Sequence, residues 1–364
     1  MDVQEKFAAT RSELSACLIE REAEVDMVLT AMAAGEHALL VGPPGTAKSM
    51  LCDAIVGWMG GSKFSILLTK YTTPEEVFGP VSLAGLKQDV YRRVTTGKMP
   101  EADVAFIDEI WKASSAILNT MLKILNERTF QNNGTLVQCP LKLCVAASNE
   151  WPGDYEGGKE LGALFDRFVL RKSVKPIASE EGRERLLWGD VEVKLSTTIT
   201  PAELETSTQE IELVKFDVIA KEALSVILDK AKAEGVMPGD RRMRKAVKVA
   251  KAYAWLCGSS VVEKDHLEIL QHVLWDDPAE QPDVLAKIVA KVANPEKAKI
   301  NSLLMEADQI VKTCNQHDTG EIIAACQKLK EIHGKLADLS GSLASKAADH
   351  VKSHHSKLMI ASIG

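Results

Sequence analysis

The sequence predicts an α/β fold in which a parallel sheet with its covering helices is followed by a region of helices alone. Two observations lead to this fold class. Short, continuously apolar segments alternate with helical patterns up to about residue 175, and such strands are typical of a parallel sheet that is covered on both faces. Beyond residue 175 helical patterns dominate. Because the chain has 364 residues, about twice the length of a usual domain, two or three domains are expected.

The first expected domain, residues 1–175, contains five predicted strands. They are the apolar segments at 37–41, 64–68, 104–107, 141–146 and 168–170. Before them, apolar residues from Leu14 to Leu29 form one helical stripe, and Gly35 ends that helix. A later helix is predicted from the core spacing of Ile117, Met121, Ile124 and Leu125.

A mainly helical lid domain is expected over residues 176–295, and a C-terminal helical segment over 296–364. The capping box Thr200-Pro201-Ala202-Glu203 opens one helix, and a short strand is predicted at 211–215. Asn294-Pro295 marks the second boundary. Further helices are predicted at about 216–233, 242–257, 264–275, 280–292, 297–316 and 321–350, with a turn at 317–320 between the last two.

Composition and charge exclude several classes of protein. Hydrophobic residues at 46% and charged residues at 26% exclude a disordered or collagen-like chain. The net charge of −7 gives no overall basic surface for nucleic acid, which is therefore not expected as a partner. No apolar run reaches the ~20 residues of a membrane span, and the N-terminus is charged. A cytoplasmic protein is expected.

A phosphate-binding loop is predicted directly after strand 37–41. Its residues are Gly42, Pro43, Pro44, Gly45, Thr46, Ala47, Lys48 and Ser49, followed by a helix that begins near Met50. Backbone amides of such a loop and the helix N-terminus behind them form an anion site, with Lys48 serving phosphate and Ser49 serving Mg²⁺. Ala47 stands where this motif has its second glycine. Alanine can adopt a helix-entry conformation, so we interpret it as a tolerated variant.

Two acids end the strand at 104–107. A carboxylate at the carboxyl end of a parallel strand lies beside the phosphate loop, so Asp108 is a candidate Mg²⁺ ligand. Glu109 is then placed as the general base for an attacking water. Taken alone, the pair could equally cap a strand end.

Asn149 and Arg167 complete the candidate set. Asn149 follows the strand 141–146 and would orient the water or contact the terminal phosphate, although an Asn at a strand end is most often a turn residue. Arg167 precedes the strand 168–170, where a surface ion pair with Asp166 is the simpler interpretation.

This order of motifs resembles an AAA+ ATPase, and in detail the MoxR family and its RavA-like branch. The likeness runs from about residue 15 to 275. It rests on the segments 73–80 (TPEEVFGP), 108–113 (DEIWKA), 117–120 (ILNT), 126–128 (NER) and 148–150 (SNE), and Ala47 also matches that family's loop.

The resemblance implies a hexameric ring with Mg-ATP between neighbouring subunits. Asn149 would be sensor 1, Arg167 an arginine finger in the neighbour's site and Arg241 sensor 2, with Arg242 as its rival. The basic first turn that holds both arginines opposes the helix dipole and so calls for an anion or an acidic partner.

The resemblance also assigns an insertion at about 70–100 that faces the ring pore. Its apolar residues Val77, Phe78, Val81 and Tyr91 suit contact with a protein segment, whereas the simpler interpretation is a surface hairpin. After the lid, longer RavA-like proteins add a small β-rich domain, but residues 296–364 predict helices only. In that segment His350 and His354 are four residues apart, and a metal at this pair is the disfavoured interpretation.

We therefore expect ATP hydrolysis coupled to the remodelling of a protein partner, by resemblance one with a von Willebrand factor A domain. A motor subunit of a magnesium-chelatase-type enzyme is the alternative. A DNA-translocating ring is a weaker one, because phosphate binding needs several Lys and Arg side chains. A nucleotide-gated scaffold is disfavoured by the presence of Glu109 and Arg167.

Overall fold

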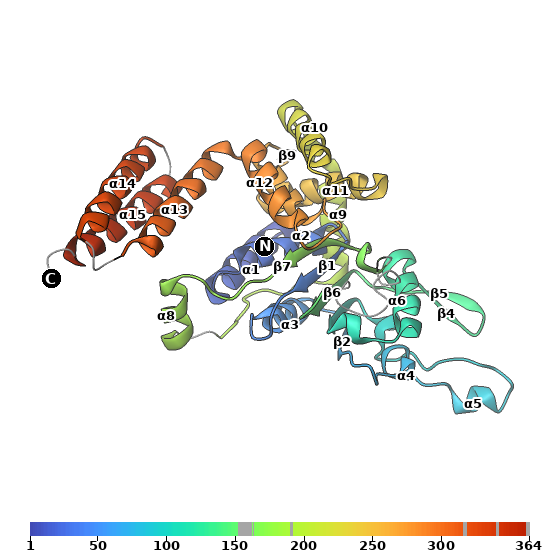
Figure 1. The fold of residues 1–364 in the computed structure, drawn as a ribbon. Coiled ribbons are helices and arrows are strands. Elements are labelled where there is room, and N and C mark those ends of the chain that lie inside the picture. The colour runs from blue at the N-terminus through green and yellow to red at the C-terminus, as the bar shows by residue number, and fades with distance from the viewer. Residues whose placement is uncertain (152–161, 163, 190–191, 316–318, 340–341, 362–364) are drawn as a thin grey trace.

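A five-stranded parallel sheet forms the centre of the computed structural model, which describes residues 1–151, 162, 164–189, 192–315, 319–339 and 342–361 (Figure 1). The strand order is β2-β3-β6-β1-β7, and every neighbouring pair is parallel. This confirms the predicted fold class. The strands are β1 (His37–Val41), β2 (Lys63–Leu67), β3 (Val104–Asp108), β6 (Leu143–Ser148) and β7 (Phe168–Ser173).

Helices cover this sheet, and every residue of β1 and β6 is buried. The predicted single helix up to Gly35 is wrong, because it is two helices, α1 (Val3–Cys17) and α2 (Glu22–Ala33). Leu18 ends α1 in extended conformation and Glu20 has a left-handed φ of 55°. The apolar spacing continues across this break. The helices α3 (Lys48–Trp58) and α6 (Ser115–Glu127) follow β1 and β3, the latter after the 3₁₀ turn η2 (Ile110–Lys112).

The segment 70–100, which the resemblance assigns as an insertion and which is called the insertion below, projects with a hairpin from one end of the molecule (Figure 1). The insertion contains the short helices α4 (Pro74–Phe78) and α5 (Leu83–Leu86) and precedes the 3₁₀ turn η1 (Met99–Glu101), and the hairpin pairs β4 (Thr129–Asn132) with β5 (Thr135–Gln138). Of the surface hairpin that was the simpler interpretation, the described residues hold one short antiparallel pairing. Val81 and Arg93 form an isolated bridge, and the amides of Ser82 and Val94 donate to the carbonyl oxygens of Arg92 and Pro80.

The helical region after the sheet begins with α8 (Glu180–Trp188) and the capped helix α9 (Pro201–Leu213). The strand predicted at 211–215 is wrong, because residues 211–213 form the last turn of α9. Only Lys215 and Phe216, named β8, pair with β9 (Val261–Val262). The other elements are α10 (Val218–Ala233), α11 (Asp240–Leu256), the 3₁₀ helix η4 (Asp265–His272) and α12 (Gln281–Ala293).

The C-terminal segment forms three helices, α13 (Pro295–Thr313), α14 (Thr319–Ala337) and α15 (Ser342–Ala361). The single helix predicted at 321–350 is therefore wrong. Of the turn predicted at 317–320, residues 317 and 318 lie outside the described residues, and Thr319 and Gly320 belong to α14. These helices bury a hydrophobic core of their own, from Ile300 to Leu358, which is separate from the core that extends from Val3 to Ala293.

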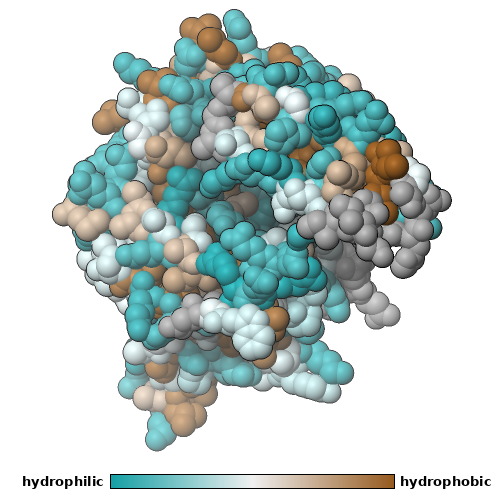
Figure 2. All heavy atoms as spheres, turned by 90° about the vertical axis from the view of Figure 1, so that its left-hand side faces the viewer, coloured by the Kyte–Doolittle hydropathy of each residue, from teal (hydrophilic) through white to brown (hydrophobic). Residues whose placement is uncertain are grey.

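Among the described residues, no helix is both long and apolar enough to cross a bilayer. On the face in Figure 2, hydrophobic side chains are scattered among hydrophilic ones around a hollow.

Ala47 joins β1 to α3 in an unfavourable backbone conformation. It caps α3 with φ 63° and ψ 17°, so the helix-entry conformation that the alanine adopts lies in the left-handed region. This region costs an L-residue roughly 1–2 kcal/mol, whereas glycine adopts it freely. The geometry explains why glycine is the usual residue of the motif at this point.

Replacing Ala47 by glycine is expected to stabilise the nucleotide-free protein by about 1 kcal/mol, since relief of the left-handed φ exceeds the added entropy of the unfolded chain. Chemical denaturation of the two proteins measures this difference. Ala54→Gly, inside the same helix, is the matched control and should destabilise by about 1 kcal/mol. Equal destabilisation by both substitutions would show that Ala47 carries no strain.

Candidate functional site

The loop Gly42–Ser49 leaves the carboxyl end of β1 and is fixed at its first residue. The amide of Gly42 donates to the carbonyl oxygen of Ser148, 3.1 Å away. A Cβ on Gly42 would lie 2.2 Å from the carbonyl oxygen of Val174, so only glycine fits between these strands. The tip from Pro43 to Gly45 is exposed, whereas Thr46 and Lys48 are buried. Met50 lies in the first turn of α3 and packs partly against the core.

Lys48 bends back over the loop. Its Nζ donates to the carbonyl oxygens of Gly42 at 2.6 Å and Pro43 at 2.9 Å, and to Oδ1 of Asn149 at 3.2 Å. Burial lowers the pKa of Lys48 from its ordinary value, while the charges of Asp108 and Glu109 act to raise it. The ammonium group thus sits between the loop and the two acids.

Ser49 and Asp108 offer two oxygens at one point. Oγ of Ser49, in the first turn of α3, lies 3.5 Å from Oδ2 of Asp108, the last residue of β3. Mg²⁺ prefers hydroxyl and carboxylate oxygens and usually keeps several of its waters. Ser49 is exposed and Asp108 is half-buried, so the pair fits an Mg²⁺ ion held directly or through water.

Glu109 is buried beside this pair, with 7% of its surface exposed. Its φ of 53° turns the chain out of β3 and directs the carboxylate toward Asn149, whose Nδ2 donates to Oε1 of Glu109. Nζ of Lys112 lies 3.3 Å from Oε2. Oε2 is buried without a hydrogen-bond partner, and a buried carboxylate with one such oxygen is suited to accept a proton from a positioned water.

Asn149 links the loop to the base. Its amide oxygen accepts from Lys48 and its amide nitrogen donates to Glu109, so both ends of the amide are used and its orientation is defined. Asn149 directly follows β6, which runs parallel to β1 and β3 and places it at the same edge of the sheet.

Arg21 supports the loop, and sequence reasoning missed it. It is 5% exposed and lies in the break between α1 and α2. Its Nε donates to the carbonyl oxygen of Thr46 at 3.1 Å, and its Nη2 to that of Lys175 at 2.8 Å. The only signal in the sequence was an arginine inside an apolar helical stripe.

Arg167 lies at the opposite edge of the sheet. It directly precedes β7, whose first residue pairs with His37 at the start of β1, whereas the phosphate loop follows the end of β1. A five-residue strand spans ~17 Å. Its Nη1 lies 3.2 Å from Oδ2 of Asp166, so the ion pair expected from the sequence is present.

Arg241 shares that opposite edge, and the two candidate sensor arginines differ in environment. Arg242 is 5% exposed; it donates to Asp166 and its Nε lies 3.2 Å from Asp276. Arg241 is exposed and donates to Asn126 near the end of α6. The first turn of α11, which was expected to need an anion or an acidic partner, therefore finds acidic partners within the same chain.

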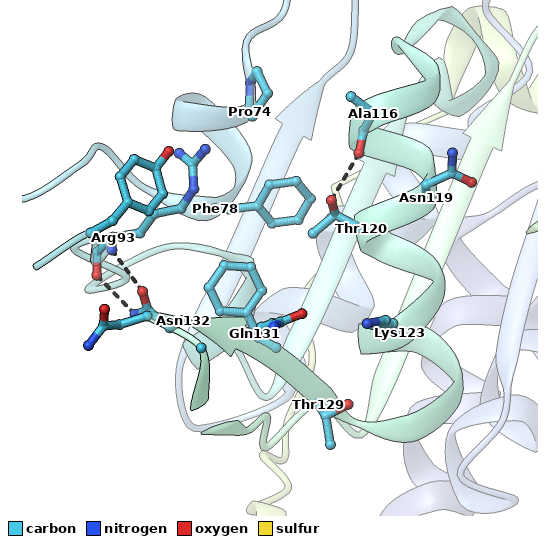
Figure 3. Close-up of a pocket in the computed structure, with 14 residues that line it drawn as sticks. Pro74, Phe78, Arg93, Ala116, Asn119, Thr120, Lys123, Thr129, Gln131 and Asn132 are labelled. Atoms are coloured by element: carbon cyan, nitrogen blue, oxygen red, sulfur yellow. Dashed lines mark hydrogen bonds between the residues drawn. The ribbon is translucent and has the colours of Figure 1, made fainter. Parts of the chain in front are cut away.

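A separate cavity of about 620 Å³ lies between the insertion, α6 and the β4–β5 hairpin (Figure 3). None of the residues predicted for the nucleotide site lines it, whereas Phe78 and Tyr91 of the insertion do. Arg93 and Asn132 exchange two hydrogen bonds across it: the amide of Arg93 donates to Oδ1 of Asn132 at 2.8 Å, and Nδ2 of Asn132 donates to the Arg93 carbonyl at 3.1 Å. These bonds join the insertion to the hairpin.

Phe78 is a core residue, which corrects the expectation that it contacts a client. It is 2% exposed and stacks on Phe130 with ring centroids 5.7 Å apart. Val77 is also fully buried, whereas Tyr91 is 58% exposed.

Comparison with known proteins relates the two larger parts of the chain to described families. Residues 5–227 match the MoxR domain of the MoxR-vWA-beta-propeller ternary systems, and residues 218–289 match an AAA lid domain. An uncharacterised protein of Methanocaldococcus jannaschii is 36% identical over 92% of this chain and 89% of its own length.

More distant similarities agree with these matches. The chaperone MoxR1 of Mycobacterium tuberculosis is 25% identical over 47% of this chain and 45% of its own length. The crystal structure of a candidate ATPase from Cytophaga hutchinsonii has the same fold, with a TM-score of 0.62 at 16% identity over 80% of this chain and 95% of that one. The chain belongs to the MoxR family of AAA+ ATPases.

Proposed function

We propose that this protein hydrolyses ATP with Mg²⁺. The observation that carries the proposal is the meeting of five side chains, those of Lys48, Ser49, Asp108, Glu109 and Asn149, at the carboxyl edge of the sheet. Membership of an ATPase family supports the same reaction. The amides of the loop and of the first turn of α3, which have no acceptor within the helix, cradle the phosphates.

Each side chain then has one task. Lys48 would turn from the loop carbonyls to the phosphates. Ser49 and Asp108 would hold Mg²⁺, which would neutralise charge on the phosphate oxygens. Glu109 accepts a proton from the attacking water. Asn149 would act as sensor 1. This role is supported by its hydrogen bonds to both Lys48 and Glu109.

We propose further that subunits complete each other's sites in a ring, a hexamer by resemblance. Arg167 lies about a strand length from its own phosphate loop, so a subunit cannot place it on its own ATP without refolding β7. A head-to-tail contact brings the amino edge of one sheet to the carboxyl edge of the next. Arg167 then acts as an arginine finger, and Arg241, which is less committed than Arg242 to ion pairs within the chain, acts as sensor 2 from the same edge.

We propose that the energy of hydrolysis remodels a protein partner. Exposed apolar side chains gather on the insertion and the hairpin that it is bonded to, where Leu83 is 77%, Tyr91 58% and Leu136 61% exposed. Such groups suit an apolar segment of a protein better than a phosphate backbone. The matched family is described in systems with a von Willebrand factor A protein, and we propose a partner of that class and a RavA-like mode of action.

Glu109→Gln is expected to retain ATP binding and to lower the rate of hydrolysis ~10²- to 10⁴-fold, because the glutamine can accept the Asn149 hydrogen bond but cannot take a proton. Phosphate release and equilibrium binding of ATP measure the two effects. Glu181→Gln, exposed on α8, is the control and should behave as wild type. Hydrolysis at the wild-type rate by Glu109→Gln would show that Glu109 is not the general base.

Mixing two inactive variants tests the shared site. An equal mixture of Glu109→Gln and Arg167→Ala subunits should regain activity, because about one quarter of head-to-tail contacts in a random ring join an intact base to an intact finger. Arg242 still pairs with Asp166 in Arg167→Ala, which preserves the fold. A mixture of Glu109→Gln with Lys48→Ala is the matched control: both lesions lie in the same half-site, so it should stay inactive. If neither mixture regains activity, Arg167 does not complete the site of a neighbouring subunit.

Tyr91→Ala is expected to leave basal hydrolysis within about twofold of wild type and to abolish stimulation by a protein partner, since the ring is exposed and lies outside the nucleotide site. Hydrolysis is measured with and without a purified von Willebrand factor A protein and, separately, with duplex DNA. Leu213→Ala, 79% exposed on α9, is the control and should keep the response. Stimulation by DNA that falls steeply with salt would favour the translocase instead.

A further inference from the structure

Three metal-ligating side chains converge on the C-terminal helices, outside the nucleotide site. Nε2 of His350 and Nε2 of His354 lie 2.9 Å apart on α15. Oδ1 of Asp308, on α13, lies 3.3 Å from the first and 3.2 Å from the second. The sequence disfavoured a metal at the two histidines, and the carboxylate that changes this view comes from 42 residues earlier in the chain.

Hydrogen bonding alone cannot satisfy this triangle. The ionised carboxylate of Asp308 only accepts, and each imidazole Nε2 either donates or accepts. If both histidines donate to Asp308, their two N–H groups face each other at 2.9 Å. If either Nε2 accepts, its lone pair faces the carboxylate oxygen. In every arrangement at least one side of the triangle joins two donors or two acceptors.

A cation at the centre removes this conflict, because all three atoms then direct lone pairs at one point. Zn²⁺ lies about 2.0–2.1 Å from imidazole nitrogen and about 2.0–2.2 Å from carboxylate oxygen in tetrahedral sites, so ligand atoms of such a site are ~3.3 Å apart. The three observed separations of 2.9, 3.2 and 3.3 Å match the edges of such a tetrahedron.

We propose that Asp308, His350 and His354 bind a first-row divalent transition-metal ion of the Zn²⁺ type and thereby clamp α13 to α15. Two imidazoles select such an ion over Mg²⁺ or Ca²⁺, which take oxygen ligands. The spacing of four residues puts both imidazoles on one face of the helix.

The surroundings suit an ion that enters from solvent. The side chain of His350 is 53% exposed, that of Asp308 46% and that of His354 23%, so a water can complete the coordination. The proposal is independent of the nucleotide site and of the function proposed for it.

Titration of the metal-stripped, nucleotide-free full chain with Co²⁺ tests the site. Wild type should bind one ion per chain at this site, with the intense visible absorption of tetrahedral Co²⁺, and Zn²⁺ should displace it whereas Mg²⁺ should not. His354→Gln and Asp308→Asn should each lower Co²⁺ affinity by at least ~10- to 100-fold, the loss typical even of outer-shell partners.

His355→Gln is the matched control, since it removes an adjacent imidazole that lies outside the triangle, and it should bind Co²⁺ as wild type does. Zn²⁺ should also raise the unfolding temperature of wild type and of His355→Gln, but not of Asp308→Asn. If His354→Gln fails to fold, the Asp308→Asn result decides alone. Asparagine preserves the shape of the half-exposed Asp308 side chain, so this variant is expected to fold. Tetrahedral Co²⁺ binding that survives Asp308→Asn, or that is lost equally in His355→Gln, overturns the proposal.

Discussion

The direction of the parallel strands is the constraint on which the arrangement of this protein depends. Because β1, β3 and β6 run the same way, the residues that follow them meet at one edge, and the residue that precedes β7 must lie at the other. Lys48, Asp108, Glu109 and Asn149 therefore assemble without long connections. The same polarity keeps Arg167 away from them, so the sheet that builds half of a site also prevents the chain from completing it.

Asp166 ties the lid to the amino edge of the sheet. It pairs with Arg167 beside it and with Arg242 of α11, while Arg171, fully buried on β7, lies 3.9 Å from the same carboxylate. Because the side chains of Arg171 and Arg242 are buried, leaving either guanidinium without this carboxylate is costly. A rotation of α11 relative to the sheet must therefore move Asp166 or break these pairs, and either change alters the support of the arginine next to it.

The sequence was most informative where a pattern is local. Apolar runs predicted all five strands of the sheet, and strand polarity then predicted which motif residues meet, as the contacts of Lys48, Ser49 and Asn149 show. The break at Glu20 was missed because apolar spacing continues through it. Contacts between distant segments, such as Arg21 with Thr46 or Asp308 with His350, leave no local pattern. The burial of Phe78 depends likewise on Phe130, 52 residues later.

The separate core of the last three helices bears on how such a chain changes over generations. Apolar packing of this bundle runs from Ile300 to Leu358 and is not shared with the core that ends at Ala293. Between them, Asn294 caps α13 through the amide of Lys297, whose ammonium group also pairs with Glu268. A recombination event at this short joint exchanges one complete core for another and leaves the packing around the sheet intact. Gene fusion can therefore join the same AAA+ domains to a different C-terminal domain while both hydrophobic cores stay intact.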